Sequence, residues 1–184
     1  MTIRLNIGCG DQRKPGHIGI DKTLRYGTDL VCEFNHPLPF ASQTINHIYA
    51  KSVLEHIERF EELICEIQRI LTNQGTFYIY VPHWNNPFYY SDYTHKRFFG
   101  LVTFDYFVKP QDQMYRHVPV YKQLNFQIVN IRLIFESPFR ILKWLNKGIQ
   151  WWVNRSIRMQ LFYEYHLSSL IPCYAIEYLL QKNT

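Results

Sequence analysis

The chain opens with Leu5-Asn6-Ile7-Gly8-Cys9-Gly10, and a second short run, Ile18-Gly19-Ile20-Asp21, follows shortly after. The first run reads as a buried strand that ends in a glycine turn, and the second as a strand that ends in an acid. Glycine lets a backbone approach a ligand closely, and a carboxylate at the end of the next strand can accept hydrogen bonds from ribose hydroxyls. The pattern predicts an α/β sheet with a nucleoside site, although Asp21 could instead cap a turn or a helix.

Strands and connections alternate through the rest of the first half. Apolar or β-rich runs predict strands at 29–32, 47–50 and 76–81, and a helix lies before the last of them. We expect Asn73-Gln74-Gly75 to end that helix with a left-handed glycine cap. This alternation predicts a parallel sheet with right-handed crossovers. The apolar residues that share one face of the helix are Phe60, Leu63, Ile64, Ile67 and Leu71.

The connection between the first two strands is unusually short. Only residues 11–16 separate Gly10 from His17, whereas a parallel crossover with its helix needs at least roughly ten to twelve residues. The first crossover is therefore predicted to lack a helix, and another part of the chain must cover that part of the sheet.

The second half is predicted to contain a lid, two strands and a helical insertion. Residues 83–122 are rich in aromatic residues and proline and are expected to form an irregular lid. The pattern predicts a strand at 126–135, helices within 138–170, and a last strand at 173–180. The two late strands should pair antiparallel to each other.

Composition indicates one domain, residues 1–184, with a net charge of +5. The positive charge permits an anionic partner but is not gathered into one Lys/Arg block. Four cysteines show no metal-ligand spacing, which favours free thiols in a reducing compartment. The sequence has no leader-like apolar run at its start and no apolar stretch of about 18 residues. We therefore expect a cytoplasmic protein without a membrane span.

Five segments in order resemble the class I S-adenosylmethionine-dependent methyltransferases, in particular the type 11 group. They are LNIGCG (5–10), GID (19–21), CEFNHPLPF (32–40), IYAKSVLEHI (48–57) and RILTNQGTFYIYVP (69–82). The resemblance implies a Rossmann-like, seven-stranded, mostly parallel sheet with an antiparallel last strand, here with a shortened first crossover. It also implies S-adenosyl-L-methionine as the cofactor.

The same resemblance implies which residues contact the cofactor. Asp21 would bind the ribose hydroxyls, Glu33 would lie near the adenine amino group, and Phe34 would flank the ring. Glu33 could equally be a solvated loop acid, and His56 could simply pack on a loop. The implied cofactor residues are Gly8, Gly10, Asp21, Glu33, Phe34, Lys51, Ser52 and His56. One departure is Asn6, which stands where many members carry an acid.

A second polar cluster, Asp92, His95 and Arg97, follows the fifth predicted strand, where a parallel sheet opens onto its substrate. His95, oriented by Asp92, could accept a proton from the substrate, and Arg97 could bind a carboxylate or phosphate. Equally, the three residues could form an internal network that holds the lid. A metal site of His83, Asp92 and His95 lacks a fixed signature, and we expect none.

The insertion at 138–170 combines tryptophans with lysines and arginines. Trp144, Ile149, Trp152 and Ile157 are expected to pack on the sheet face left bare by the missing helix. They could instead form a dimer surface or lie at a membrane interface, where the basic residues would face lipid headgroups. Those basic residues are Lys143, Lys147, Arg155 and Arg158.

Together these features predict methyl transfer from S-adenosylmethionine to a small-molecule or sugar acceptor, and make nucleic acid an unlikely substrate because no basic run tracks phosphates. Two alternatives stay open: a non-catalytic cofactor-binding or interaction protein on the same fold, and a peripheral membrane enzyme that acts on a lipid-linked glycan.

Overall fold

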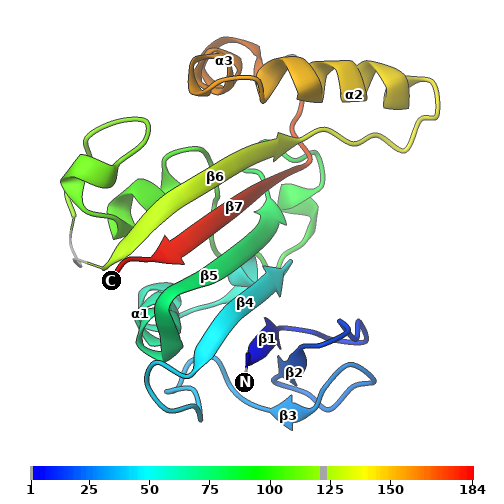
Figure 1. The fold of residues 1–184 in the computed structure, drawn as a ribbon. Helices are drawn as coiled ribbons and strands as arrows, with labels where there is room; N and C mark the ends of the chain where they lie inside the picture. The colour runs from blue at the N-terminus through cyan, green and yellow to red at the C-terminus, as the bar shows by residue number, and fades with distance from the viewer. Residues whose placement is uncertain (1, 121–123) are drawn as a thin grey trace.

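The computed structural model describes residues 2–120 and 124–184, so the end of the expected lid at residues 121–122 lies outside the described residues. Seven strands form one sheet in the order β3-β2-β1-β4-β5-β7-β6, and β7 runs antiparallel to both of its neighbours (Figure 1). This confirms the predicted fold class. The strands are β1 (Arg4–Ile7), β2 (Ile18–Asp21), β3 (Leu30–Val31), β4 (Ile45–Lys51), β5 (Leu71–Pro82), β6 (Phe126–Ile134) and β7 (Ala175–Lys182).

Three α-helices and several single helical turns complete the described chain. The helices are α1 (Phe60–Ile70), α2 (Leu142–Val153) and α3 (Ile157–Phe162). The turns are η1 (Leu54–His56), η2 (Tyr89–Ser91), η3 (Thr103–Phe107), η4 (Pro110–Asp112) and η5 (Tyr163–Leu167). No helix among the described residues is long and apolar enough to cross a membrane.

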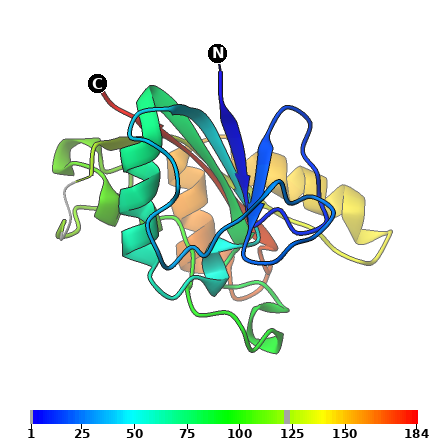
Figure 2. The ribbon, with the colours of Figure 1, turned by 90° about the horizontal axis from the view of Figure 1, so that it is seen from below.

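Helix α1 forms because its apolar side chains recur on one face and the sheet buries that face. Phe60, Leu63, Ile64 and Ile67 are all buried and join one core with the inward-facing residues of the strands. Burying a side chain of this size contributes roughly 1.5–3 kcal/mol. Figure 2 shows α1 and α3 on the same side of the strands while α2 projects away from them, and Figure 1 shows that α1 and α3 lie at opposite ends of the sheet.

The predicted glycine cap of α1 is wrong. The helix already ends at Ile70, and Leu71 begins β5, where it pairs with Ile45. The left-handed residue is Gln74, with φ +63°, rather than Gly75. Leu71 is fully buried, so the chain passes from the helix directly into the sheet. The left-handed turn at Gln74 lies where the β4–β5 pairing shifts register, between the pairs Ile45–Leu71 and His47–Thr76.

The first crossover has no helix, as predicted; the described chain forms none anywhere from residue 8 to residue 44. The connection between β2 and β3 instead crosses this part of the sheet, and the Gly27 amide donates to the Gly10 carbonyl at 3.1 Å. A Cβ built on Gly19 would lie 1.9 Å from the Gly27 carbonyl oxygen. The side-chain amide of Asn6 donates to the Gln12 carbonyl at 3.1 Å. The asparagine that replaces the acid of many family members therefore holds the short loop in place.

The insertion does not cover that face, contrary to expectation. It lies beyond β6, at the edge of the sheet opposite β3 (Figure 1). The Asn154 side chain fastens it there, because its amide donates to the Leu133 carbonyl and its oxygen accepts from the Leu133 amide. Trp144, expected to pack, is 80% exposed.

Replacement of Gly19 by alanine should destabilise the protein by at least about 2 kcal/mol, because the added Cβ overlaps the Gly27 backbone and the loop must shift. Urea unfolding would measure the change. Gly148→Ala is the matched control: its Cβ meets nothing within 4 Å, and alanine in a helix should stabilise by up to about 1 kcal/mol. Equal stability of the two variants would contradict the close approach of the loop.

Candidate active site

Two neighbouring cavities open at the carboxyl ends of the central strands. The first has a volume of about 420 Å³ and the second about 400 Å³. Six of the eight residues expected to contact the cofactor line the first cavity: Gly8, Asp21, Glu33, Phe34, Ser52 and His56. The structure thus brings together residues from four separate segments of the chain.

The glycine turn and the acid at the end of β2 form one hydrogen-bonded unit. The Gly10 amide donates to Asp21 Oδ2 at 2.9 Å, and the Thr23 amide donates to Oδ1 at 3.1 Å. Gly8 and Gly10 have φ values of +64° and +51°, in the region that favours glycine. Gly10 does not line the first cavity itself; its amide orients the carboxylate that does.

Lys51 and Ser52 lie where β4 ends. Ser52 has φ +51°, an uncommon conformation for a residue with a side chain, and its amide donates to the Tyr80 carbonyl at 2.8 Å. Lys51 turns its ammonium over the Tyr80 ring, 5.2 Å from the centroid, and lines the second cavity rather than the first. Ser52 and His56 line both cavities, so the two spaces meet there.

His95 and Asp92 both line the second cavity. His95 Nδ1 lies 2.9 Å from the Tyr89 carbonyl oxygen, which can only accept, so Nδ1 carries a proton. In the neutral ring, Nε2 is then the free basic nitrogen, and it lies 3.6 Å from Asp92 Oδ2. The geometry leaves one lone pair of His95 available within the cavity.

Thr94 links this pair to His56. Its hydroxyl lies 2.5 Å from Asp92 Oδ1 and 2.9 Å from His56 Nδ1. The hydrogen bond from Thr94 holds the pKa of Asp92 below its usual value. Burial lowers the pKa of His56, which favours a neutral ring. The His56 and His95 rings lie 5.0 Å apart.

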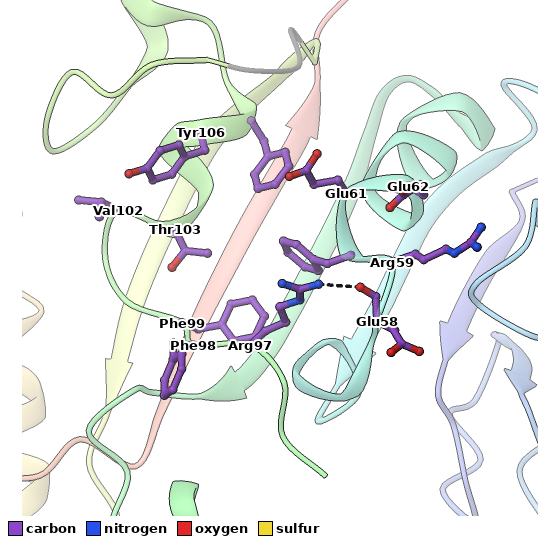
Figure 3. Close-up of a pocket in the computed structure, with 12 residues that line it drawn as sticks. Glu58, Arg59, Glu61, Glu62, Arg97, Phe98, Phe99, Val102, Thr103 and Tyr106 are labelled. Atoms are coloured by element: carbon purple, nitrogen blue, oxygen red, sulfur yellow. Dashed lines mark hydrogen bonds between the residues drawn. The ribbon is translucent and has the colours of Figure 1, made fainter. Parts of the chain in front are cut away.

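Arg97 lies outside both cavities. Its guanidinium donates to the carbonyls of Ile57 and Glu58, the latter at 2.6 Å. It lines a third and larger space of about 650 Å³ between the start of α1 and η3 (Figure 3). Arg97 therefore connects the lid to the segment before α1. This is the structural role that the sequence analysis gave as the alternative to substrate binding.

Glu55 is the site residue that sequence reasoning missed. It lines the second cavity yet is only 1% exposed, and its Oε2 has no hydrogen-bond partner among the described residues. Burial raises its pKa to about 7. The apolar neighbours Val53, Leu54 and Ile57 are the sequence signal that could have indicated a buried acid.

Glu55 also belongs to a group of residues that could hold a metal ion. One ligand atom each from Glu55, His56 and His95 lie within 4.8 Å of one another. The metal set weighed from the sequence is not assembled, because His83 is fully buried elsewhere, 3.6 Å from Glu164.

Comparison with known proteins agrees with this geometry. The model of a methyltransferase domain family matches residues 15–79. Residues 15–79 are therefore similar to this family in sequence, and the seven-stranded sheet of the whole chain has the class I methyltransferase fold. S-adenosylmethionine is the cofactor that this family implies. No curated protein matches the sequence.

Solved structures share the fold of this chain at low sequence identity. A S-adenosylmethionine-dependent methyltransferase from Archaeoglobus fulgidus superposes with a TM-score of 0.64 at 15% identity, over 98% of this chain and 86% of the other. A Haloferax volcanii complex of the Trm112 methyltransferase activator with its assigned methyltransferase gives 0.60 at 15% identity, over 98% and 82%. The YcgJ protein of Bacillus gives 0.54 at 13% identity, over 99% and 92%.

Replacement of Glu55 by glutamine should make stability less dependent on pH. The folded pKa of Glu55 lies near 7, above the usual 4.5, so the wild type loses stability as pH rises through that interval. The free energy of unfolding of the variant should rise relative to that of the wild type between about pH 4.5 and 7, by up to about 3 kcal/mol, and the difference should persist at higher pH.

Urea unfolding at several pH values would measure this gain. Glu58→Gln is the matched control, since the Glu58 side chain is 71% exposed, and its difference from the wild type should stay flat. A Glu55→Gln difference that is the same at every pH would contradict a buried, unpartnered carboxyl.

Proposed function

We propose that this single-domain enzyme transfers a methyl group from S-adenosylmethionine in the first cavity to a small polar molecule or sugar in the second. The observation that supports this most directly is the junction of the two cavities at Ser52 and His56. A methyl group must pass between donor and acceptor at van der Waals distance, about 3–3.5 Å. Adjoining spaces provide that approach.

In this proposal the first cavity holds the nucleoside. The Asp21 carboxylate, already oriented by the Gly10 amide, has lone pairs left for the ribose hydroxyls. Glu33 and Phe34 line the same space further along the chain, where they would contact the adenine. The backbone of Gly8 and Ser52 would face the methionyl part.

The bound cofactor supplies an activated methyl group on a sulfonium. His95 Nε2 would take the proton that the acceptor gives up as it is methylated. The Tyr89 carbonyl holds the ring through Nδ1, and Asp92 stabilises the imidazolium that results.

The second cavity favours a small polar acceptor. Its lining offers the Lys51 ammonium, the Asn86 amide and the hydroxyl of Tyr80, together with the carboxylates of Asp92 and Glu136. Several hydrogen-bonding groups around about 400 Å³ fit a sugar or hydroxylated metabolite. The carboxylates disfavour nucleic acid, whose phosphates they would repel. The four free cysteines favour a cytoplasmic setting.

The alternative function is a cofactor-binding protein without catalysis. The absence of a helix after β1 favours it, because no helix dipole then supports the glycine turn. A structural neighbour was solved with the Trm112 activator, so a partner protein could also complete the activity here. Calorimetry with S-adenosylhomocysteine, followed by methyl release with a panel of sugars and hydroxy acids, separates binding from catalysis.

Asp21→Ala should weaken S-adenosylhomocysteine binding by at least about tenfold, because charge-assisted hydrogen bonds to the ribose are lost. Isothermal calorimetry measures the affinity. Asp11→Ala, on the exposed first loop, is the control and should bind as the wild type does. Unchanged affinity in a folded Asp21→Ala protein would remove Asp21 from the site.

His95→Ala should lower the rate of methyl transfer by about 10²–10⁴-fold, because the proton acceptor is lost, and leave cofactor affinity nearly unchanged. Release of S-adenosylhomocysteine with an acceptor from the panel gives the rate. Tyr93→Ala, 96% exposed beside it, should behave as wild type. Parallel loss of thermal stability and cofactor affinity, with no separate effect on rate, would show a structural lid network instead.

A further inference from the structure

Helix α2 and the residues around it form an exposed surface of mixed aromatic and basic character, here called the α2 surface. Large apolar side chains stand in solvent along it: Phe139 is 68% exposed, Ile141 88%, Trp144 80% and Trp151 70%. Trp144 and Trp151 are seven residues apart and so lie on one stripe of the helix. Val153 is the only residue of α2 that is fully buried. The structure thus leaves most of an apolar helix without a partner.

The α2 surface is also strongly positive. The segment 137–163 contains five basic residues and no Asp or Glu, although the whole chain has a net charge of only +5. All five are exposed, and the structure shows no salt bridge to any of them within residues 2–120 and 124–184. They are Arg140, Lys143, Lys147, Arg155 and Arg158.

Cations and tryptophans alternate closely along this surface. The Lys147 ammonium lies 5.3 Å from the Trp144 ring centroid, and the Arg155 guanidinium 5.9 Å from that of Trp151. Tryptophan prefers the headgroup level of a bilayer, where basic side chains meet anionic lipids. A symmetric pairing of two copies would instead place five cations against five cations. Charge complementarity therefore selects an anionic lipid surface over a second copy.

An apolar cavity connects the α2 surface with the second cavity. It has a volume of about 540 Å³ and is lined by Pro87, Phe139 and Leu142 among others. Its wall shares Phe88, Glu136 and Tyr174 with the second cavity. A molecule with a polar head in the second cavity could therefore place an apolar tail here, next to the start of α2.

We propose that the α2 surface docks this enzyme on an anionic lipid membrane and that the acceptor is an amphipathic molecule whose tail occupies this apolar cavity. The acceptor assignment rests on the proposed function of the second cavity. The docking stands on the α2 surface alone.

Vesicle sedimentation tests the docking. The wild type should bind vesicles of phosphatidylcholine with 30% phosphatidylglycerol, because basic residues near the surface are attracted to anionic lipid, and bind pure phosphatidylcholine at least tenfold more weakly. Lys143→Glu/Lys147→Glu and Trp144→Ser/Trp151→Ser should each weaken binding at least tenfold, and raised salt should do the same. The matched controls are Arg4→Glu in β1 and Leu24→Ser/Tyr26→Ser in the β2–β3 connection, all at exposed positions outside the α2 surface.

Binding to neither vesicle, or equal loss in the control variants, would overturn the docking. Sedimentation velocity gives the second decisive outcome. If the wild type is a dimer that does not bind vesicles, and Trp144→Ser/Trp151→Ser converts it to a monomer, the α2 surface pairs two copies instead.

Calorimetry with octyl glucoside below its micelle concentration, against glucose, tests the acceptor class. Octyl glucoside should bind at least tenfold more tightly, and Leu142→Asp should abolish that difference. Equal affinity of the two sugars, or no effect of Leu142→Asp, would overturn it. S-adenosylhomocysteine affinity is measured in the same samples. If the wild type does not bind S-adenosylhomocysteine, the proposed function is refuted. If it does bind, a failed octyl glucoside test overturns only the acceptor assignment.

Discussion

The hydrogen bond from the Gly10 amide to the Asp21 carboxylate joins the ends of β1 and β2, and the first cavity depends on it. In a sheet with a full first crossover, a helix would stand behind this turn and support it with its dipole. Here the loop is fastened by single contacts: Asn6 to the Gln12 carbonyl, and Gly27 to the Gly10 carbonyl. The second contact requires glycine at position 27, because a Cβ there would lie 2.8 Å from the Gly10 carbonyl oxygen.

The sequence determined the first half of the fold well because its signals are local. Apolar runs that end in glycine or in an acid indicate buried strands, and their order specified the sheet. The end of α1 was misjudged because Gly75 looks like a cap, whereas burial of Leu71 continues the chain into β5. Glu55 was missed because its burial depends on how the lid packs over it, a contact between segments that no local pattern records.

Because the described chain forms no helix from residue 8 to residue 44, side chains cover that part of the sheet. Tyr49 and Tyr78 stack with centroids 5.0 Å apart and planes within 3°, and the Lys14 ammonium lies 3.8 Å from the Tyr49 ring. The Tyr78 hydroxyl donates to Glu177 at 2.8 Å. Burial lowers the pKa of His47, next to this stack, to about 4, so its ring is neutral. Aromatic rings with polar tips replace a helical layer here because their rings cover the sheet and their polar tips still contact water.

Charge is separated across the molecule, and the separation orients it. Carboxylates of Asp92 and Glu136 line the second cavity, while residues 137–163 carry only positive charge. An anionic surface would attract the α2 surface and repel Asp92, so the protein would settle with α2 against the surface and Asp92 away from it. Glu136 lies between the two, because it lines both the second cavity and the apolar cavity. The apolar cavity between them would then face the lipid and the polar one the water. Both would meet at Phe88 and Tyr174, where the head and the tail of an amphipathic acceptor would join.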